Sequence, residues 1–175
     1  MHDHNKLVMN EINKILDHLE DSELIEVYSK IITLLKSRGV IRTKNLLGDL
    51  AEFLVINFYG KTPGLPNLQA APAGTQNVDA LSREGNRYSI KATSGTTTGV
   101  FYGLNPPESD LIENQKFEYV IIACFDDTFR LTKILELTWS QFLNHKRWHT
   151  RMRAWNLSVT KNLLNNCKVI YNIND

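Results

Sequence analysis

The chain has 175 residues, of which 42% are hydrophobic and 22% are charged, and its net charge is +1. This composition excludes a disordered chain, and the length suits a single domain over residues 1–175. The near-neutral charge neither requires nor excludes a nucleic acid partner, because a binding surface needs only local charge. Two cysteines are too few for a disulfide framework. We find no secretory leader or apolar span and therefore expect a cytoplasmic protein.

Two helices are expected in the N-terminal part of the chain, residues 1–40. Residues 7–18 and 21–35 carry apolar side chains at helical spacing. Asp21 offers an N-cap for the second helix, and Gly39 ends it. The second helix is apolar over more than one face, so it is either deeply buried or shared with another subunit.

A third helix is expected from Thr43 to Tyr59, ending at Gly60. Its core stripe consists of apolar residues at helical spacing, namely Leu46, Leu47, Leu50, Ala51, Leu54, Val55 and Phe58. Glu52 points away from this stripe. Periodicity alone therefore predicts that Glu52 is a solvated glutamate.

A β-hairpin is expected where residues 77–81 and 88–92 form two strands. Alternation places Asp79 on one face of the first strand, and Ser89 and Lys91 on one face of the second, away from the core. A three-residue loop at 84–86 would pair Asp79 with Lys91, and Leu81 with Ser89. A four-residue loop would put Asp79 and Lys91 on opposite faces. Because Gly85 suits a tight loop, we favour the first register.

An aspartate beside a lysine on one sheet face suits phosphodiester cleavage. This reaction needs a divalent cation, which carboxylates hold through oxygen ligands. Asp79 would be the main metal ligand, and Lys91 would orient a water and offset charge on the phosphorus oxygens. The alternative is a surface ion pair that contributes little.

Two loops, residues 61–76 and 93–108, flank the hairpin and are rich in Pro, Gly and hydroxyl side chains. They are candidates for contacting a groove, and ordinary surface loops are the alternative. Further along, residues 117–125 predict a central strand because they are apolar on both faces. We also expect a strand over residues 129–137.

The C-terminal part, residues 138–175, should begin with a short helix capped by Thr138 and end with a strand at 169–171. Between them, four basic side chains lie among histidine and tryptophan residues and are candidates for contacting DNA: Lys146, Arg147, Arg151 and Arg153. The alternative is a solvated face with Trp148 and Trp155 in the core.

The segment Gly48–Glu52, then Asp79, then Ser89-Ile90-Lys91, resembles the PD-(D/E)xK nuclease superfamily. It is closer still to a bacterial branch, including small restriction endonucleases, in which Gln replaces the acid before x-Lys. The resemblance covers residues 43–137. It implies an α/β fold in which a restriction-endonuclease-like mixed central sheet is flanked by helices, with the N-terminal helical pair added.

The resemblance also implies a function. Glu52 and Asp79 would hold Mg²⁺, with Mn²⁺ as a substitute, and the catalytic residues would be Glu52, Asp79, Ser89 and Lys91. The protein would be a magnesium-dependent endonuclease that hydrolyses double-stranded DNA, most plausibly a type II restriction enzyme acting as a homodimer. The alternative is a catalytically inactive DNA-binding or assembly protein with a nuclease-like fold.

Ser89 departs from the superfamily pattern, because a hydroxyl is a poorer ligand for a hard cation than a carboxylate. Three outcomes are open. Glu52 and Asp79 hold one metal with a backbone carbonyl and water, another acid such as Glu84 or Asp49 enters the site, or the site is inactive. A structural module in which Asp79 and Lys91 form only an ion pair is a further hypothesis.

Overall fold

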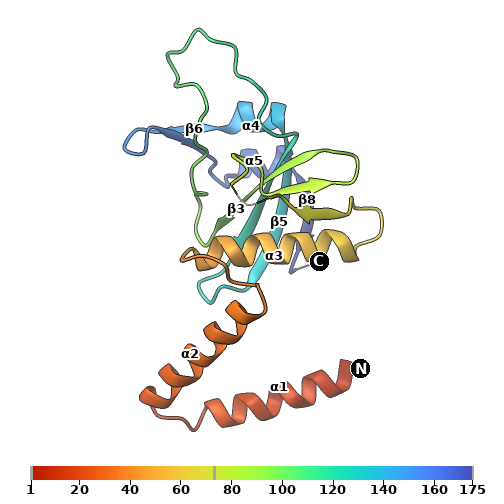
Figure 1. Cartoon of the computed structure of the whole chain (residues 1–175), viewed down its shortest axis with the longest axis vertical. Helices are drawn as coiled ribbons and strands as arrows, with labels where there is room; N and C mark the ends of the chain where they lie inside the picture. The colour runs from red at the N-terminus through yellow and green to blue at the C-terminus, as the bar shows by residue number, and fades with distance from the viewer. Residues whose placement is uncertain (1, 73, 175) are drawn as a thin grey trace. The chain divides into compact units, whose positions relative to one another are not determined.

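The computed structural model describes residues 2–72 and 74–174. Figure 1 shows the path of the chain. The chain forms two compact units, residues 1–43 and 44–175, which are described separately below.

The first unit contains the predicted helical pair, α1 (His2–Leu16) and α2 (Asp21–Ser37). The N-cap of α2 is Glu20, so the prediction of an N-cap at Asp21 is wrong by one residue. A capping box starts the helix: the Glu20 amide donates a hydrogen bond to the Glu23 carboxylate at 2.9 Å, which satisfies an amide that the helix leaves unpaired. Gly39 follows the helix with a φ of +70°, as a helix-ending glycine does. Among the described side chains of α1 and α2, none is buried.

The second unit begins with α3 (Leu46–Lys61), which confirms the predicted third helix with its start moved three residues along the chain. The Asn45 side chain caps α3 by accepting a hydrogen bond from the Gly48 amide at 3.2 Å. A Cβ atom on Gly48 would collide with the Asn45 amide group, so the cap requires glycine at this position. Along α3, Ala51, Val55 and Tyr59 are buried.

The described strands of this unit build a six-stranded sheet in the order β1-β2-β3-β4-β5-β8. The strands are β1 (Leu68–Ala70), β2 (Ala80–Ser82), β3 (Arg87–Thr93), β4 (Tyr119–Phe125), β5 (Leu131–Thr138) and β8 (Lys168–Asn172). Strands β3 and β4 run parallel and the other neighbours run antiparallel, so the sheet is mixed and mostly antiparallel. The coarse prediction of an α/β fold with a mixed central sheet is confirmed.

Both faces of the sheet are covered. Helix α3 lies across one face, as Figure 1 shows. Its residues Val55 and Tyr59 belong to the same buried cluster as Ile90 and neighbouring strand residues. The other face packs against α4 (Trp139–His145) and α5 (Lys161–Asn166), with a core of Phe101, Phe117, Phe142, Leu157 and Leu163. This double cover explains why β4 is apolar on both sides.

The C-terminal part follows the predicted order, with two additions. Thr138 caps α4, and β8 is the predicted terminal strand. Sequence reasoning missed β1, which lies inside the first long loop, and a hairpin of β6 (Arg147–His149) and β7 (Ala154–Asn156) inside the basic segment. Strands of three residues are too short to show an alternating pattern.

The predicted hairpin register is wrong. Ala80 pairs with Tyr88, and Leu81 pairs with Arg87 instead of Ser89. The loop is three residues long, as expected, but it consists of residues 83–85, with Gly85 at a φ of +85°. The side-chain alternation is preserved, because the pairing moves by an even number of residues.

Long-range charge favours the observed register. Arg87 binds the Glu118 carboxylate at 2.7 Å, and this hydrogen-bonded pair holds the pKa of Glu118 below its usual value. The register that we predicted would have placed Arg87 opposite Arg83, where two like charges repel. Glu118 lies 31 residues further along the chain, so local sequence gives no sign of this pair.

Candidate functional site

Asp79 lies immediately before β2 and is held by backbone and side-chain contacts. Its amide donates to the Tyr88 carbonyl at 2.8 Å. Its Oδ2 atom accepts hydrogen bonds from the Ile90 amide at 2.7 Å and from the Ser89 hydroxyl at 3.3 Å. The Lys91 Nζ atom lies 3.7 Å from the same oxygen. Among the described residues, all these side-chain contacts use Oδ2, which leaves Oδ1 to accept a ligand.

Lys91 is fixed on two sides. Its ammonium group pairs with Asp79 and lies 5.2 Å from the centre of the Phe101 ring, a cation–π contact. The Lys91 side chain is 22% exposed, so its charge is partly desolvated but still reaches solvent. Phe101 itself is buried, which makes it a rigid support for the lysine.

A recess of about 360 Å³ brings the predicted acid of α3 to this pair. Its lining contains Glu52, Asp79 and Lys91, together with Asn45, Leu47, Gly48, Ile90, Ala92 and Gly99. Glu52 is partly buried, in contrast to the solvated residue that helical periodicity predicts. Helix α3, the residue before β2 and strand β3 therefore bring two carboxylates and one lysine to a single recess.

A second recess of about 280 Å³ borders the same pair. It shares Asp79 and Lys91 with the first recess and is otherwise lined by Gln76, Asn77, Val100, Tyr102 and Gly103. The two long loops supply this lining, one with residue 76 and the other with residues 100–103. Asp79 and Lys91 thus line both recesses.

The second of these loops is anchored to the C-terminal part of the chain. The Thr98 amide donates to the Leu157 carbonyl at 2.9 Å, and the Phe101 amide donates to the Trp155 carbonyl at 2.6 Å. These bonds hold residues 98–103 beside Lys91 and Asp79. Sequence reasoning placed the loop near the hairpin but gave no sign of these distant anchors.

Ser89 has no exposed surface, and its hydroxyl is directed at Asp79. The face of β3 that carries Ser89 and Lys91 was expected to point away from the core, but it lies under the buried cluster that contains Phe101. In this position the Ser89 hydroxyl helps to orient the Asp79 carboxylate. Ser89 itself lies in the lining of neither recess.

Few of the described acidic side chains lie where they could hold a cation beside Lys91. Among the described residues, no group of three or more His, Cys, Asp or Glu side chains gathers at one point. Glu84 lies exposed in the hairpin turn, where a hydrogen bond with Ser82 holds its pKa below the usual value, and Asp49 is buried in α3. The two carboxylates lining the first recess are Glu52 and Asp79.

A backbone carbonyl can add a third oxygen. The N–H and C=O groups of one strand residue point to the same side of the strand. The Ile90 amide points to Asp79, so the Ile90 carbonyl is directed to the same side, beyond Ala80, the first residue of β2. Two carboxylates and a carbonyl are hard oxygen donors, which fits one Mg²⁺ or Mn²⁺ with water completing the coordination.

The four basic candidates differ in their surroundings. Lys146 is mostly covered, lies 3.7 Å from Glu113 and 4.2 Å from the centre of the Trp155 ring, and its charge is therefore offset within the protein. Arg147, Arg151 and Arg153 are exposed on the β6–β7 hairpin. Arg147 also borders a polar recess of about 300 Å³ with Ser158 and Thr160 among its lining.

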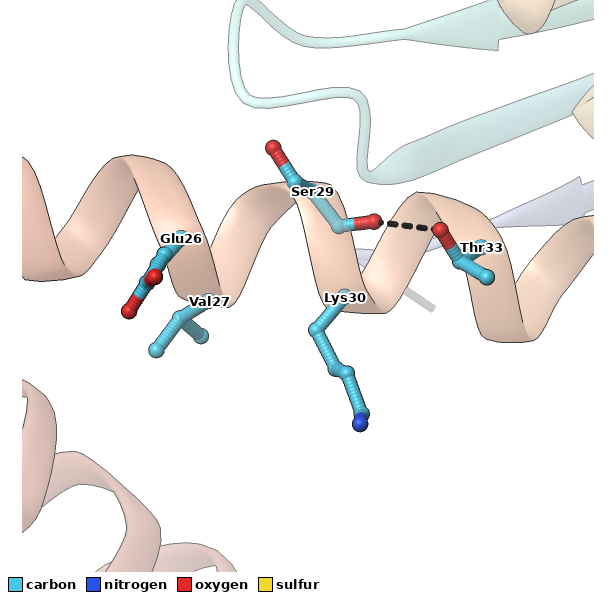
Figure 2. A pocket seen from close by; sticks show the side chains of 5 residues that line it. All are labelled: Glu26, Val27, Ser29, Lys30 and Thr33. Atoms are coloured by element: carbon cyan, nitrogen blue, oxygen red, sulfur yellow. Dashed lines mark hydrogen bonds between the residues drawn. The ribbon is translucent and has the colours of Figure 1, made fainter.

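A further recess of about 520 Å³ lies along α2 and is lined by that helix alone (Figure 2). The Thr33 hydroxyl donates to the Ser29 carbonyl at 2.9 Å, and the Ser29 hydroxyl donates to the Ile25 carbonyl at 3.0 Å. Both hydroxyls are therefore used by the helix backbone. This recess shows the polar face of α2 and offers no group of converging side chains.

In the described part of the chain, no helix combines the length and the apolar character needed to cross a membrane. Comparison of the sequence with models of known protein families gives no match, and comparison with curated proteins gives none either.

Proposed function

We propose that the protein is a divalent-metal-dependent endonuclease that hydrolyses double-stranded DNA, most plausibly a type II restriction endonuclease. The observation that carries this proposal is the recess shared by Glu52, Asp79 and Lys91. A surface ion pair would not need a second carboxylate from a helix, a buried hydroxyl and a backbone amide around it. The mixed sheet with helices on both faces is compatible with the proposed restriction-endonuclease-like fold.

Each residue has a defined part in the proposed mechanism. Glu52, Asp79 and the Ile90 carbonyl would hold Mg²⁺, which supplies charge neutralisation and an activated water when bound. Lys91 presents its ammonium group to the phosphate oxygens and offsets the charge that develops on them. Ser89 and the Ile90 amide fix Oδ2 of Asp79, so that the carboxylate keeps one orientation.

DNA would lie across the two recesses beside Asp79. The exposed residues Arg147, Arg151 and Arg153 are the best candidates for phosphate contacts, while Lys146 contributes little because Glu113 offsets its charge. The two long loops border the recess next to Asp79 and would reach a groove. Cutting both strands with symmetry would require a homodimer.

A second candidate function is DNA binding without catalysis. The replacement of an expected acid by a buried serine favours it, because one hard ligand is missing from the site. In this case Asp79 and Lys91 would stabilise the hairpin, and the exposed arginines would still contact phosphates.

Incubation with long DNA of mixed sequence in Mg²⁺ or Mn²⁺ tests the proposal. We expect discrete fragments, and we expect Asp79→Asn to lower cleavage at least ~1,000-fold because it removes the main metal ligand. Asp127→Asn is the matched control, since Asp127 is an exposed turn residue outside both recesses. Absence of cleavage with either metal, together with a band shift in Ca²⁺, would favour the non-catalytic protein.

A further inference from the structure

The described part of the N-terminal unit does not by itself cover its apolar side chains. In the described part of α1 and α2, ten large apolar side chains are between 38% and 65% exposed: Leu7, Val8, Met9, Ile12, Ile15, Leu24, Ile25, Tyr28, Ile31 and Leu34. Helix α2 has 17 residues and buries none of them. The two helices therefore do not bury each other's apolar faces.

Such a helix needs a partner surface. Isolated helices of this length are marginal in water, and amphipathic helices gain most of their stability by packing the apolar face. The opposite face of α2 carries Glu26, Ser29, Lys30 and Thr33, as Figure 2 shows. The apolar face is thus a distinct surface that requires cover.

The sequence of α2 has a two-fold pattern about the midpoint between Ser29 and Lys30. Six pairs of positions at equal distance from this midpoint carry apolar residues together or opposite charges together: Leu24 with Leu35, Ile25 with Leu34, Val27 with Ile32, Tyr28 with Ile31, Glu23 with Lys36, and Asp21 with Arg38, the C-cap residue. An antiparallel pair of identical helices places such positions against each other. A two-fold interface has this self-complementary form, in which residue i contacts j and j contacts i.

We propose that α2 packs antiparallel against α2 of a second copy of this chain, with α1 extending the interface. The acidic first turn of one helix then lies beside the basic last turn of the other, while the apolar side chains meet between them. A parallel pair would instead place Asp21 and Glu23 next to their own copies. The charge pattern therefore selects the antiparallel arrangement.

The available area is sufficient for a stable dimer. Ten large side chains that are roughly half exposed amount to on the order of 800 Å² per copy, which matches one side of a standard protein–protein interface. This inference goes beyond the proposed nuclease function and does not depend on it, because self-association is measured without DNA or metal.

The first test is the mass of the full-length protein in solution. We expect sedimentation analysis to give twice the monomer mass, and Ile31→Glu to weaken association by about 100-fold, since it places a charge inside the apolar interface. Thr33→Glu is the matched control on the polar face of the same helix and should leave the dimer unchanged.

A charge-exchange experiment tests the orientation. One variant, Asp21→Lys with Glu23→Gln, keeps the capping box, because Gln can replace Glu there. The other is Lys36→Glu with Arg38→Glu. Each variant alone should associate at least ~10-fold more weakly, and an equimolar mixture should recover the association, because a basic helix end then meets an acidic one.

Two results would overturn the proposal. A wild-type protein that stays monomeric at high micromolar concentration has its apolar face covered in another way, or by another partner. A dimer whose two charge variants do not recover on mixing is not built from antiparallel α2 helices. Far-ultraviolet circular dichroism of each variant shows whether its helices remain formed.

Discussion

Lys91 and Lys146 each pair with one carboxylate and lie over one aromatic ring, but these partners have different surroundings. Lys91 lies 3.7 Å from Asp79 and over the Phe101 ring, while Lys146 lies 3.7 Å from Glu113 and over the Trp155 ring. Distance and aromatic contact therefore do not distinguish a candidate catalytic pair from a structural one. The two pairs differ in the other contacts that each carboxylate makes.

The carboxylate of Glu113 is occupied by its own loop. It accepts a hydrogen bond from the Asn105 amide at 2.8 Å, and the Asn105 carbonyl accepts one from the Trp155 indole at 2.7 Å. This network closes the base of the loop that Figure 1 shows extending away from the sheet. Asp79, in contrast, borders two recesses and shares one of them with Glu52. The Asp79–Lys91 pair therefore differs from the Glu113–Lys146 pair because it borders open space and lies near a second acid.

The largest expected effect separates the two lysines by activity. Lys91→Met should lower DNA cleavage by about 100- to 1,000-fold, because it removes the cation that offsets charge on the phosphate oxygens. Lys146→Met should retain cleavage within about threefold after correction for folded protein. Single-turnover rates with saturating enzyme measure both. Equal losses of cleavage rate in the two variants would contradict the assignment of Lys91, and not Lys146, to catalysis.

The second effect separates them by stability. Lys146→Met leaves the Glu113 carboxylate, whose side chain is 12% exposed, without its cation and should lower the free energy of unfolding by about 2 kcal/mol. Urea denaturation measures this change. Double replacement of Lys146 and Glu113 by Met and Gln should recover part of it, because no charge is then left unpaired. An unchanged free energy of unfolding in Lys146→Met would show that water can replace Lys146 as the partner of Glu113.

A smaller effect concerns the support of Asp79. Ser89→Ala removes the hydroxyl that donates to Oδ2 and should lower the cleavage rate by about tenfold, since the carboxylate loses one of its fixed contacts. Ser89→Thr keeps a hydroxyl and should recover most of the rate if the buried site accommodates the methyl group. Metal titration of the rate should show the loss mainly at limiting metal. An unchanged metal dependence would assign Ser89 to packing alone.

The smallest effect tests the opposite face of the sheet, away from both lysines. The buried Tyr59 hydroxyl donates to Glu136 at 2.8 Å, and burial together with that carboxylate raises the pKa of Tyr59 far above its usual value. Tyr59→Phe should therefore cost about 1 kcal/mol near pH 7. Because the tyrosine pKa is higher in the folded state, wild-type stability should fall as pH rises above about 10.

The Phe variant should show less of this alkaline loss, which urea denaturation from pH 8 to 11 measures. Parallel curves for the two proteins would mean that Tyr59 does not titrate differently in the folded and unfolded states. Cleavage at pH 7.5 should be unchanged by Tyr59→Phe, since this residue touches neither recess.

Much of the candidate site could be predicted because the positions of Asp79 and Lys91 follow from residues close to them in the sequence. Alternation placed Asp79 and Lys91 on one face, and the odd-length turn preserved that relation although the register was wrong. Glu52 is different, because helical periodicity predicted a solvated residue and only the nuclease resemblance indicated a ligand. Its position in the recess depends on how α3 packs across the sheet.

The sequence by itself determined the elements with strong local signals. The three long helices, the apolar strand β4 and the Thr138 cap follow from periodicity, burial on both faces and capping chemistry. The sequence of α2 also contains its own two-fold pattern of charge and apolar residues. These features depend on neighbours within a few positions along the chain.

Only the tertiary structure decided which polar groups meet. Arg87 finds Glu118, Lys146 finds Glu113, and Lys91 finds the Phe101 ring, and each partner lies outside the local segment. These contacts form when the sheet and its two covers come together, because burial makes an unpaired charge costly and selects the register and packing that pair it. The same selection buries Ser89, which we predicted as a catalytic residue, and directs its hydroxyl to Asp79.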